Sequence, residues 1–227
     1  MQEEGVTKFS AVHETRALPA RRYGKACAEL VAWRGILARL ELVGQDPARY
    51  GGAGYGNVSC RVPPYPGRPG ARPFLISGTQ TGGNPCMSLA EHAVVTRYDI
   101  AGNSVVSEGL SRPSSESMTH GAIYDLGGQI RWVLHAHCPP LWRRAQSLRI
   151  PCTPEGVDYG TVEMALCVKR LWRSSPLPEL RIFAMLGHDD GIVTFGRTAS
   201  EAGEVLVTAL ARAYTLDCEA DGVLCTS

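Results

Sequence analysis

Two histidines separated by a single residue, His135 and His137, form the chemically most suggestive pair in the sequence. They end an apolar stretch that begins at Trp132 and predicts a β-strand. Alternate side chains of a strand lie on one face, so both imidazoles point to the same side, while Leu134 and Ala136 point to the other. Two adjacent imidazoles repel when both are charged, and a shared metal ion removes that conflict. The alternative is a strand end with two solvated histidines.

A third histidine, His188, is a candidate ligand of the same metal ion. The stretches Ile182–Leu186 and Ile192–Phe195 predict two strands, and the turn between them contains the hairpin signal Asp190-Gly191. His188 is therefore expected at a strand end. A lone histidine in a turn is more often solvated than bound to metal, so this prediction depends on the other two imidazoles.

A pair of serines precedes a glutamate at a predicted helix start. Pro113-Ser114-Ser115-Glu116 opens a helix that is predicted to run to Asp125. The free N–H groups and the positive dipole end of such a helix favour an anion, whereas plain capping by the serines is the alternative. Glu116, expected in the first turn, either compensates the helix dipole or lies near the histidine strand as an acid or base. His120, one turn further, is predicted to be a packing residue.

Two glycine-rich segments are further candidate anion sites. Residues Gly51–Asn57 contain too much glycine for an ordinary helix or strand, and they lead into a strand predicted over Val58–Val62. Ser77-Gly78 begins a turn rich in hydroxyl groups and glycine after the short predicted strand Phe74–Ile76. Backbone N–H groups and serine hydroxyls of such loops can hold phosphate without any lysine. An ordinary turn is the alternative for either loop taken alone.

Amphipathic helices are predicted around these segments. Apolar periodicity predicts helices over Gly24–Val43 and Thr161–Trp172, and a shorter one over Trp142–Leu148. A capping box at Thr198–Glu201 opens the last long helix. Residues Met1–Leu18 are polar and aperiodic, which predicts a flexible arm. Since no repeat or linker interrupts the chain, residues 1–227 are predicted to form one domain.

The overall composition is that of a soluble globular protein. The sequence has 23 Lys and Arg and 22 Asp and Glu, which gives a net charge of +1. Neither nucleic acid nor a membrane is therefore expected as a partner, and the expected partner is a small molecule. The chain has no apolar run of about 18 residues and no leader of the secretory type, and a cytoplasmic protein is expected. Its eight cysteines include no C-x-x-C pair, which predicts reduced thiols.

Taken together and in order, these motifs resemble those of the class II aldolase/adducin-head family, over residues 24–216. That family includes the fuculose-phosphate and rhamnulose-phosphate aldolases and ribulose-phosphate 4-epimerase. The matching motifs are Gly56-Asn57-Val58-Ser59, Ser77-Gly78, Pro113-Ser114-Ser115-Glu116, His135-Ala136-His137 and Gly187-His188-x-x-Gly191. The combination is far more specific than any single motif.

The resemblance implies an α/β fold with three layers, α/β/α, a central and mainly antiparallel sheet, and assembly as a homotetramer. One divalent metal ion per subunit is implied, most often zinc, with cobalt or manganese as further possibilities. Its implied ligands are His135, His137 and His188. The implied phosphate-binding residues are Asn57, Ser77, Gly78, Ser114 and Ser115.

The resemblance also implies a reaction, that of a metal-dependent aldehyde-lyase. A small ketose phosphate or a related anionic hydroxy-carbonyl compound would be cleaved through a metal-stabilised enediolate, with Glu116 as acid and base. Glutamate after the two serines resembles the aldolases, because the 4-epimerase has aspartate there. An epimerase, a dehydratase, a decarboxylase and a non-enzymatic oligomeric module like the adducin head are the alternatives. Tyr124 and Tyr159 are candidates for a second proton donor.

Overall fold

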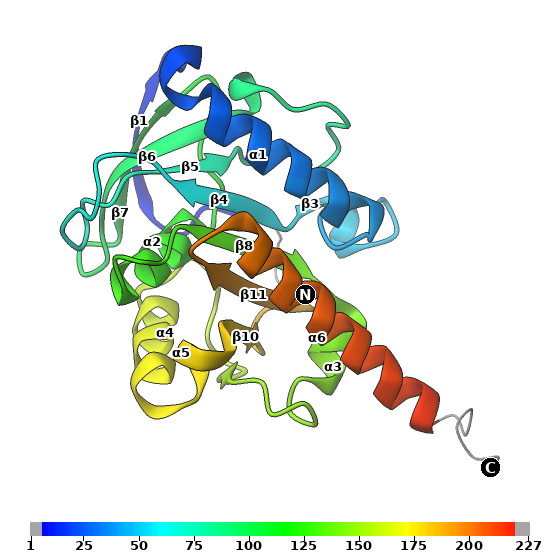
Figure 1. Cartoon of the computed structure of the whole chain (residues 1–227). Coiled ribbons are helices and arrows are strands. Elements are labelled where there is room, and N and C mark those ends of the chain that lie inside the picture. The colour runs from blue at the N-terminus through cyan, green and yellow to red at the C-terminus, as the bar shows by residue number, and fades with distance from the viewer. Residues whose placement is uncertain (1–5, 221–227) are drawn as a thin grey trace.

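Within residues 6–220, which the computed structural model describes, a nine-stranded sheet forms the centre of the molecule (Figure 1). Its strands are β1 (Ser10–Thr15), β4 (Asn57–Arg61), β5 (Phe74–Ser77), β6 (His92–Asp99), β7 (Ser104–Gly109), β8 (Trp132–His137), β9 (Cys152–Thr153), β10 (Ile182–Met185) and β11 (Gly191–Gly196). Their spatial order is β1-β7-β6-β5-β4-β8-β11-β10-β9. β1 runs parallel to β7 and β9 parallel to β10, whereas the other neighbouring pairs are antiparallel.

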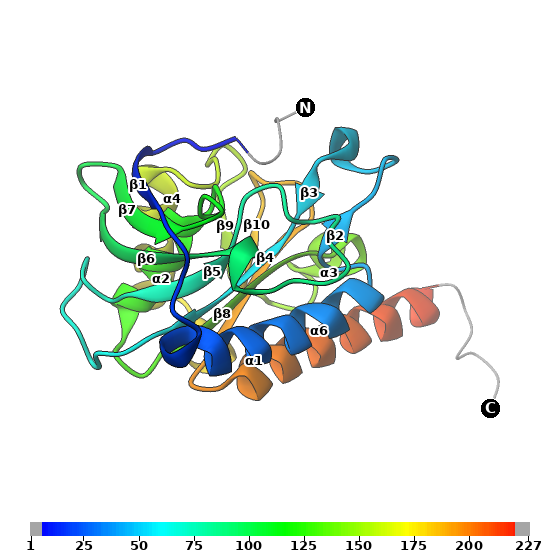
Figure 2. The ribbon, with the colours of Figure 1, turned by 90° about the horizontal axis from the view of Figure 1, so that it is seen from above.

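Helices cover both faces of this sheet (Figure 2). They are α1 (Ala20–Arg39), α2 (Ser117–Leu126), α3 (Pro139–Arg144), α4 (Val162–Ser174), α5 (Leu177–Leu180) and α6 (Ala199–Ala220). α1 and α6 lie side by side on one face, and α2 packs against α4 on the other. Each helical layer covers its own hydrophobic core. The predicted three-layer α/β/α fold with a mainly antiparallel sheet is confirmed.

Short elements complete the chain. A small hairpin of β2 (Gly44–Gln45) and β3 (Gly54–Tyr55) encloses the 3-10 turn η1 (Tyr50–Gly52), and a second turn, η2 (Leu89–Glu91), precedes β6. A capping box formed by Ser88 and Glu91 begins η2, as the Ser-x-x-Glu spacing favours. α4 also starts as predicted, with the Thr161 hydroxyl accepting from the Met164 N–H at 3.2 Å. α3 begins earlier than the predicted residue 142, because Pro139 and its neighbour occupy the first turn, where proline's fixed φ suits a helix.

Helix α1 ends where a backbone turn, rather than a glycine, stops it. Its buried side chains recur every three or four residues: Tyr23, Cys27, Leu30, Arg34 and Leu37. The predicted range 24–43 is wrong at both ends. Glu41 takes a left-handed φ of 58°, and the Leu42 N–H donates to the Leu37 carbonyl at 2.9 Å. This Schellman turn directs Leu42 back into the core.

The prediction of a flexible arm over residues 1–18 is wrong for the part that forms β1. This strand extends the sheet beyond β7, and the His13 Nδ1 lies 2.9 Å from the Ser107 hydroxyl. The side chains of β1 are exposed apart from the half-buried His13, because the strand lies at the edge of the sheet. A polar edge strand leaves no hydrophobic pattern in the sequence. Residues 1–5 of the predicted arm lie outside the described residues.

A buried polar network lies in the core beneath α2. The Ser59 hydroxyl on β4 is 2.7 Å from His120 Nδ1 and 2.7 Å from the Tyr124 hydroxyl. His120 is inaccessible to solvent, as expected for a packing residue, and burial lowers its pKa to about 3. The imidazole is therefore uncharged at neutral pH.

Two further expectations concern membranes and thiols. Among the helices of residues 6–220, none combines the length and the hydropathy needed to span a bilayer. The seven cysteines in this part of the chain are free thiols, as predicted.

A matched pair of leucines tests the packing of α1. Leu37 is fully buried under the helix, whereas Leu40 at its end is 43% exposed. Leu37→Ala should lower the free energy of unfolding by about 2–5 kcal/mol, because it leaves a cavity in the core. Leu40→Ala should lower it by less than about 1 kcal/mol. Urea unfolding followed by circular dichroism measures both, and equal effects would contradict this orientation of α1.

Acid should destabilise the protein in part through His120. Its pKa in the folded state lies below the ordinary value of 6.5, so as the pH falls below 6.5 the unfolded chain binds a proton that the folded chain does not. The free energy of unfolding should therefore fall between about pH 6.5 and pH 4, and His120→Gln should reduce that slope by up to about 1.4 kcal/mol per pH unit. Urea titrations in a metal chelator measure the slope, and an unchanged slope in the variant would refute the assignment.

Candidate metal centre

Strand β8 positions the histidine pair at the middle of the sheet, between β4 and β11. All six of its side chains are buried. Leu134, Ala136 and Cys138 belong to the core beneath α1 and α6. His135 and His137 therefore face the opposite side, as the alternation of a strand predicts.

Four side chains from three separate segments converge beside β8. In Glu116, His135, His137 and His188, the atoms that could bind a metal lie within 4.8 Å of one another. The carboxylate oxygen Oε1 of Glu116 is 3.0 Å from His135 Nδ1 and 3.2 Å from His188 Nε2. None of the four residues is more than 3% exposed. We call this group the metal cluster, and it contains all four residues predicted to form the centre.

The turn between β10 and β11 places His188 in the metal cluster. The His188 N–H donates to the Met185 carbonyl at 3.1 Å, and the Gly191 N–H donates to the His188 carbonyl at 2.9 Å. A Cβ atom at Gly191 would lie 2.9 Å from the His188 ring, and one at Gly187 would lie 2.4 Å from a backbone carbonyl. Glycine at 191 therefore leaves room for the third imidazole, and glycine at 187 lets the turn pack closely against the Val157 carbonyl.

The chemistry of the metal cluster fits a divalent cation. Three imidazoles and one carboxylate are a ligand set typical of zinc. Among the described residues, the buried atoms His135 Nε2 and Glu116 Oε2 have no hydrogen-bond partner. Buried polar atoms without partners are rare in folded proteins, and a cation would satisfy them. The metal cluster is thus a buried group that could bind a divalent metal ion.

The charges in the metal cluster favour the same interpretation. Burial alone would raise the pKa of Glu116, but the facing rings of His135 and His188 outweigh burial and hold its pKa well below the usual value. Burial, followed by the neighbouring His188 and His135, lowers the pKa of His137 well below its usual value. An ionised carboxylate and an uncharged imidazole are the forms that bind metal.

Glu116 lies at the N-cap of α2. The sequence had predicted it in the first turn of the helix, and that prediction is wrong. Its φ of −98° and ψ of 9° are not helical, and its side chain caps no backbone N–H. The Ser114 hydroxyl accepts from the Glu116 N–H at 3.3 Å, and the Ser117 hydroxyl donates to the Ser114 carbonyl at 2.7 Å. Because the serines hold this turn, the carboxylate is left to point at the histidines.

The predicted anion loops lie next to the metal cluster. The Asn57 side-chain nitrogen is 3.2 Å from His135 Nδ1. The Ser114 N–H donates to the Ser77 carbonyl at 3.2 Å, and Gly78 forms a β-bridge with the residue before Ser114. Loops that are far apart in the sequence are therefore joined by backbone hydrogen bonds at one edge of the site.

Not all of the donors expected in these loops are available. The Gly78 N–H donates to the Glu91 carbonyl at 2.8 Å, and the Thr79 N–H donates to the Arg112 carbonyl at 2.9 Å. These amides stabilise the fold, so the expectation of glycine-freed N–H groups is wrong here. Serine hydroxyls and the Asn57 amide are the better donors for an anion. Phosphate binding stays a prediction for Asn57, Ser77, Gly78, Ser114 and Ser115.

Of the two tyrosines considered as proton donors, only Tyr159 contacts the metal cluster. Its ring centroid is 4.5 Å from that of His188. The N-terminal segment packs over it, with the Val6 N–H donating to its hydroxyl at 3.1 Å and the Lys8 ammonium 4.2 Å from its ring centroid. Tyr124 instead bonds the Ser59 hydroxyl of the buried network. The role of either tyrosine as a proton donor stays a prediction.

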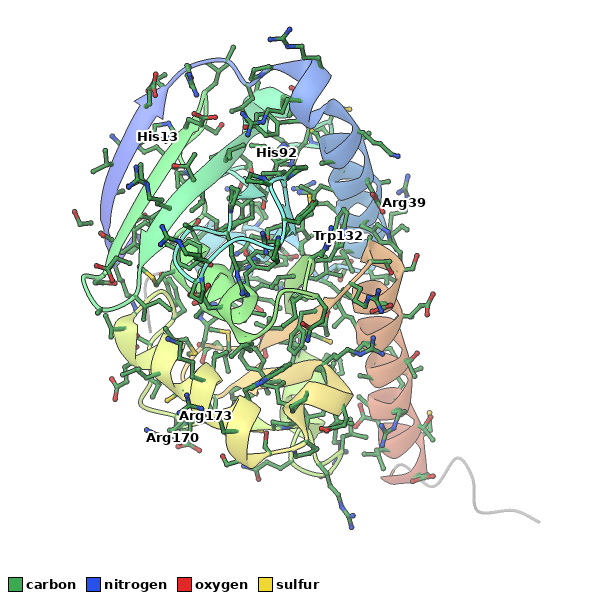
Figure 3. All side chains as sticks on the ribbon, turned by 60° about the vertical axis from the view of Figure 1, so that its left-hand side comes forward. His13, Arg39, His92, Trp132, Arg170 and Arg173 are labelled. Carbon is green, nitrogen blue, oxygen red and sulfur yellow. The ribbon has the colours of Figure 1, made fainter. Side chains whose placement is uncertain are left out.

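The remaining histidines of residues 6–220 do not join the metal cluster. Figure 3 shows His13 on the edge strand and His92 beside α1. The His92 Nδ1 lies 2.6 Å from the Ser88 carbonyl and 3.7 Å from the Cys27 sulfur. Partners outside the metal cluster thus bind both ring nitrogens of His13 and the Nδ1 atom of His92.

Sequence reasoning missed three residues that surround His137. The ring centroids of Tyr50 and Tyr55 lie 4.6 and 5.6 Å from that of His137, and Arg49 packs over both tyrosines. The Tyr50 hydroxyl donates to Asp190 at 2.7 Å. The only signal in the sequence is an aromatic and a basic residue directly before the glycine-rich loop, which is too weak to identify a site.

Solved structures share this fold at low sequence identity. An L-fuculose 1-phosphate aldolase is 20% identical with a TM-score of 0.61, and the match covers 88% of each chain. The L-fuculose-1-phosphate aldolase of Thermus thermophilus is 18% identical with a TM-score of 0.62, over 90% of this chain and 98% of that one. A sugar-phosphate aldolase of Thermotoga maritima is 16% identical with a TM-score of 0.63, over 88% of this chain and 97% of that one.

The sequence itself matches one family profile over most of its length. A search among curated proteins finds no match. The profile described as "Class II Aldolase and Adducin N-terminal domain" matches residues 48–215, a range that contains the whole metal cluster and all of the predicted anion loops. The chain therefore belongs to the class II aldolase and adducin N-terminal domain family.

Proposed function

We propose that this chain is a divalent-metal-dependent aldehyde-lyase that cleaves a small ketose phosphate or a related anionic hydroxy-carbonyl compound. The observation that carries the proposal is the convergence of His135, His137 and His188 on the carboxylate of Glu116, within a buried site. A module that only assembles with other proteins has no use for such a group. Solved structures with this fold include L-fuculose 1-phosphate aldolases, which supports a phosphorylated sugar as the substrate.

In this proposal the three imidazoles hold the ion and Glu116 moves the proton. Zinc is the first choice of metal, which when bound acts as a Lewis acid that polarises a substrate carbonyl. The low pKa of Glu116 keeps the carboxylate ionised at neutral pH, which is the form that accepts a proton. Its location at the cap of α2, between two imidazoles, holds the carboxylate at the place where substrate would bind.

The anionic end of the substrate is assigned to the loops beside the metal cluster. Ser77, Ser114 and Ser115 offer hydroxyl donors, and the Asn57 amide lies between these loops and His135. No full positive charge is needed, because several neutral donors in a partly dehydrated site can hold a phosphate. Assembly as a homotetramer, which is carried over from the family resemblance, and a cytoplasmic location, which is the expectation from the sequence, belong to the same proposal.

The metal is tested by elemental analysis of the purified protein. The wild-type chain should hold about one divalent ion, and His135→Ala should lose most of it, because removal of one ligand typically weakens a three-histidine site severely. His13→Ala, which removes a histidine of the edge strand, is the control and should keep the ion. Equal metal content in the wild type and in His135→Ala would contradict the assignment.

The reaction is tested with a panel of phosphorylated ketoses. Release of an aldehyde together with a second carbonyl fragment identifies a lyase, whereas an epimerase, a dehydratase or a decarboxylase gives other products. Glu116→Gln should keep the metal and slow both cleavage and the exchange of substrate C–H protons with deuterated water by about 100-fold to 10,000-fold. Proton exchange that survives this substitution would remove Glu116 from its proposed role.

A further inference from the structure

The loop between β2 and β3 packs against the metal cluster but has no part in the proposed reaction. The Tyr50 ring meets the His137 ring edge-on, with 4.6 Å between centroids. The Tyr50 hydroxyl donates to Asp190 Oδ2 at 2.7 Å and accepts from Arg49 Nη2 at 2.9 Å. The hydroxyl is therefore held from both sides, by a carboxylate and by a guanidinium.

These bonds connect the two segments that carry His137 and His188. Arg49 also donates to the backbone carbonyl of His137 at 3.4 Å, at the end of β8. Asp190 follows His188 by two residues in the turn between β10 and β11. Its backbone carbonyl accepts from the N–H of the residue after His137 at 2.8 Å. The end of β8 and the β10–β11 turn are therefore joined twice. A backbone hydrogen bond joins them directly, and the side chains of Arg49, Tyr50 and Asp190 join them a second time.

The backbone has an unfavourable conformation at both residues that the Tyr50–Asp190 hydrogen bond joins. Tyr50 has a φ of 49° and Asp190 a φ of 62°, both in the left-handed region that side chains other than glycine rarely adopt. Such residues typically cost about 1–3 kcal/mol and persist only where their surroundings fix them. Gly51 and Gly52 also have positive φ angles, so the turn puts an aromatic residue where glycine would fit more easily. The side-chain bonds of Tyr50 are what opposes this strain.

We propose that Tyr50 is a positioning residue for the metal ligands, whose hydroxyl, held between Arg49 and Asp190, fixes the separation of His137 and His188. The inference rests on the metal-dependent function proposed above. Ligands must lie within a few tenths of an ångström of their working geometry, and the groups behind them change metal affinity by about 10-fold to 100-fold. Tyr50 acts through the two segments and need not touch the ion.

The test compares two tyrosines that make the same bond in different places. Tyr50→Phe keeps the ring against His137 and removes the hydroxyl. Tyr98→Phe is the matched control, because the Tyr98 hydroxyl donates to Asp125, also at 2.7 Å, away from the metal cluster. Cobalt(II) affinity is measured on the full chain by competition with a chelator, together with the visible absorption of the bound ion. Tyr50→Phe should bind cobalt about 10-fold to 100-fold more weakly, with an altered spectrum, and Tyr98→Phe should match the wild type.

Variants of the acceptor separate a link from a general loss of folding. Asp190→Asn keeps an oxygen acceptor and tolerates the left-handed backbone, so it should retain cobalt affinity. Asp190→Gly removes the acceptor without backbone strain, and it should lose as much affinity as Tyr50→Phe. The double variant should be no worse than either single one, because both remove the same interaction. Thermal unfolding of the metal-free proteins shows whether each variant is folded.

The possible results distinguish this inference from the proposed function. Wild-type affinity in Tyr50→Phe, or additive losses in the double variant, would overturn the role of Tyr50 and leave the metal site intact. If the wild-type protein binds cobalt no more tightly than His135→Ala does, the metal site itself is overturned, and the role of Tyr50 with it.

Discussion

A carboxylate and three imidazoles lie together in one buried site. The free-energy cost of burying them there explains much of the surrounding structure. An ionised carboxylate out of water costs several kcal/mol unless opposite charge or hydrogen bonds compensate it. At Glu116 that compensation comes from two facing rings, and one of its oxygens has no partner among the described residues. A bound cation would complete it. The metal cluster is therefore locally destabilising to the fold, and its side chains are already in position for a cation.

The surrounding elements share the task of bringing the ligands together. The central strand β8 supplies two imidazoles at fixed spacing, and the adjacent β10–β11 turn supplies the third, across an antiparallel pairing that sets their register. The cap of α2 supplies the carboxylate, since the serines before it take over the hydrogen bonds of the helix start. Gly191 then leaves room for the third ring, and Gly187 lets its turn pack closely against the neighbouring backbone. Each of these side chains thus comes from an element that is held in place by its own hydrogen bonds.

The parts of this arrangement that could be predicted are those with a periodic pattern. Alternation in β8 was enough to place His135 and His137 on one face, and helical spacing located α4 and the core face of α1. His188 was a candidate by residue type alone until the resemblance to a family added it to the ligand set, because nothing local in its turn indicates a metal. β1 escaped prediction since a solvated edge strand carries no hydrophobic signal. Tyr50 and Arg49 were missed because their role depends on contacts with residues far along the chain.

The central location of β8 would separate loss of a bound ion from loss of the fold. β8 is paired on both sides, and the His137 N–H also donates to the Leu42 carbonyl at 2.8 Å. Backbone in the middle of a sheet becomes accessible only when the whole molecule opens, so these amides belong to the slowest class in hydrogen exchange. If the centre holds an ion as proposed, a chelator would empty it while its walls keep their shape, and reloading would need no refolding.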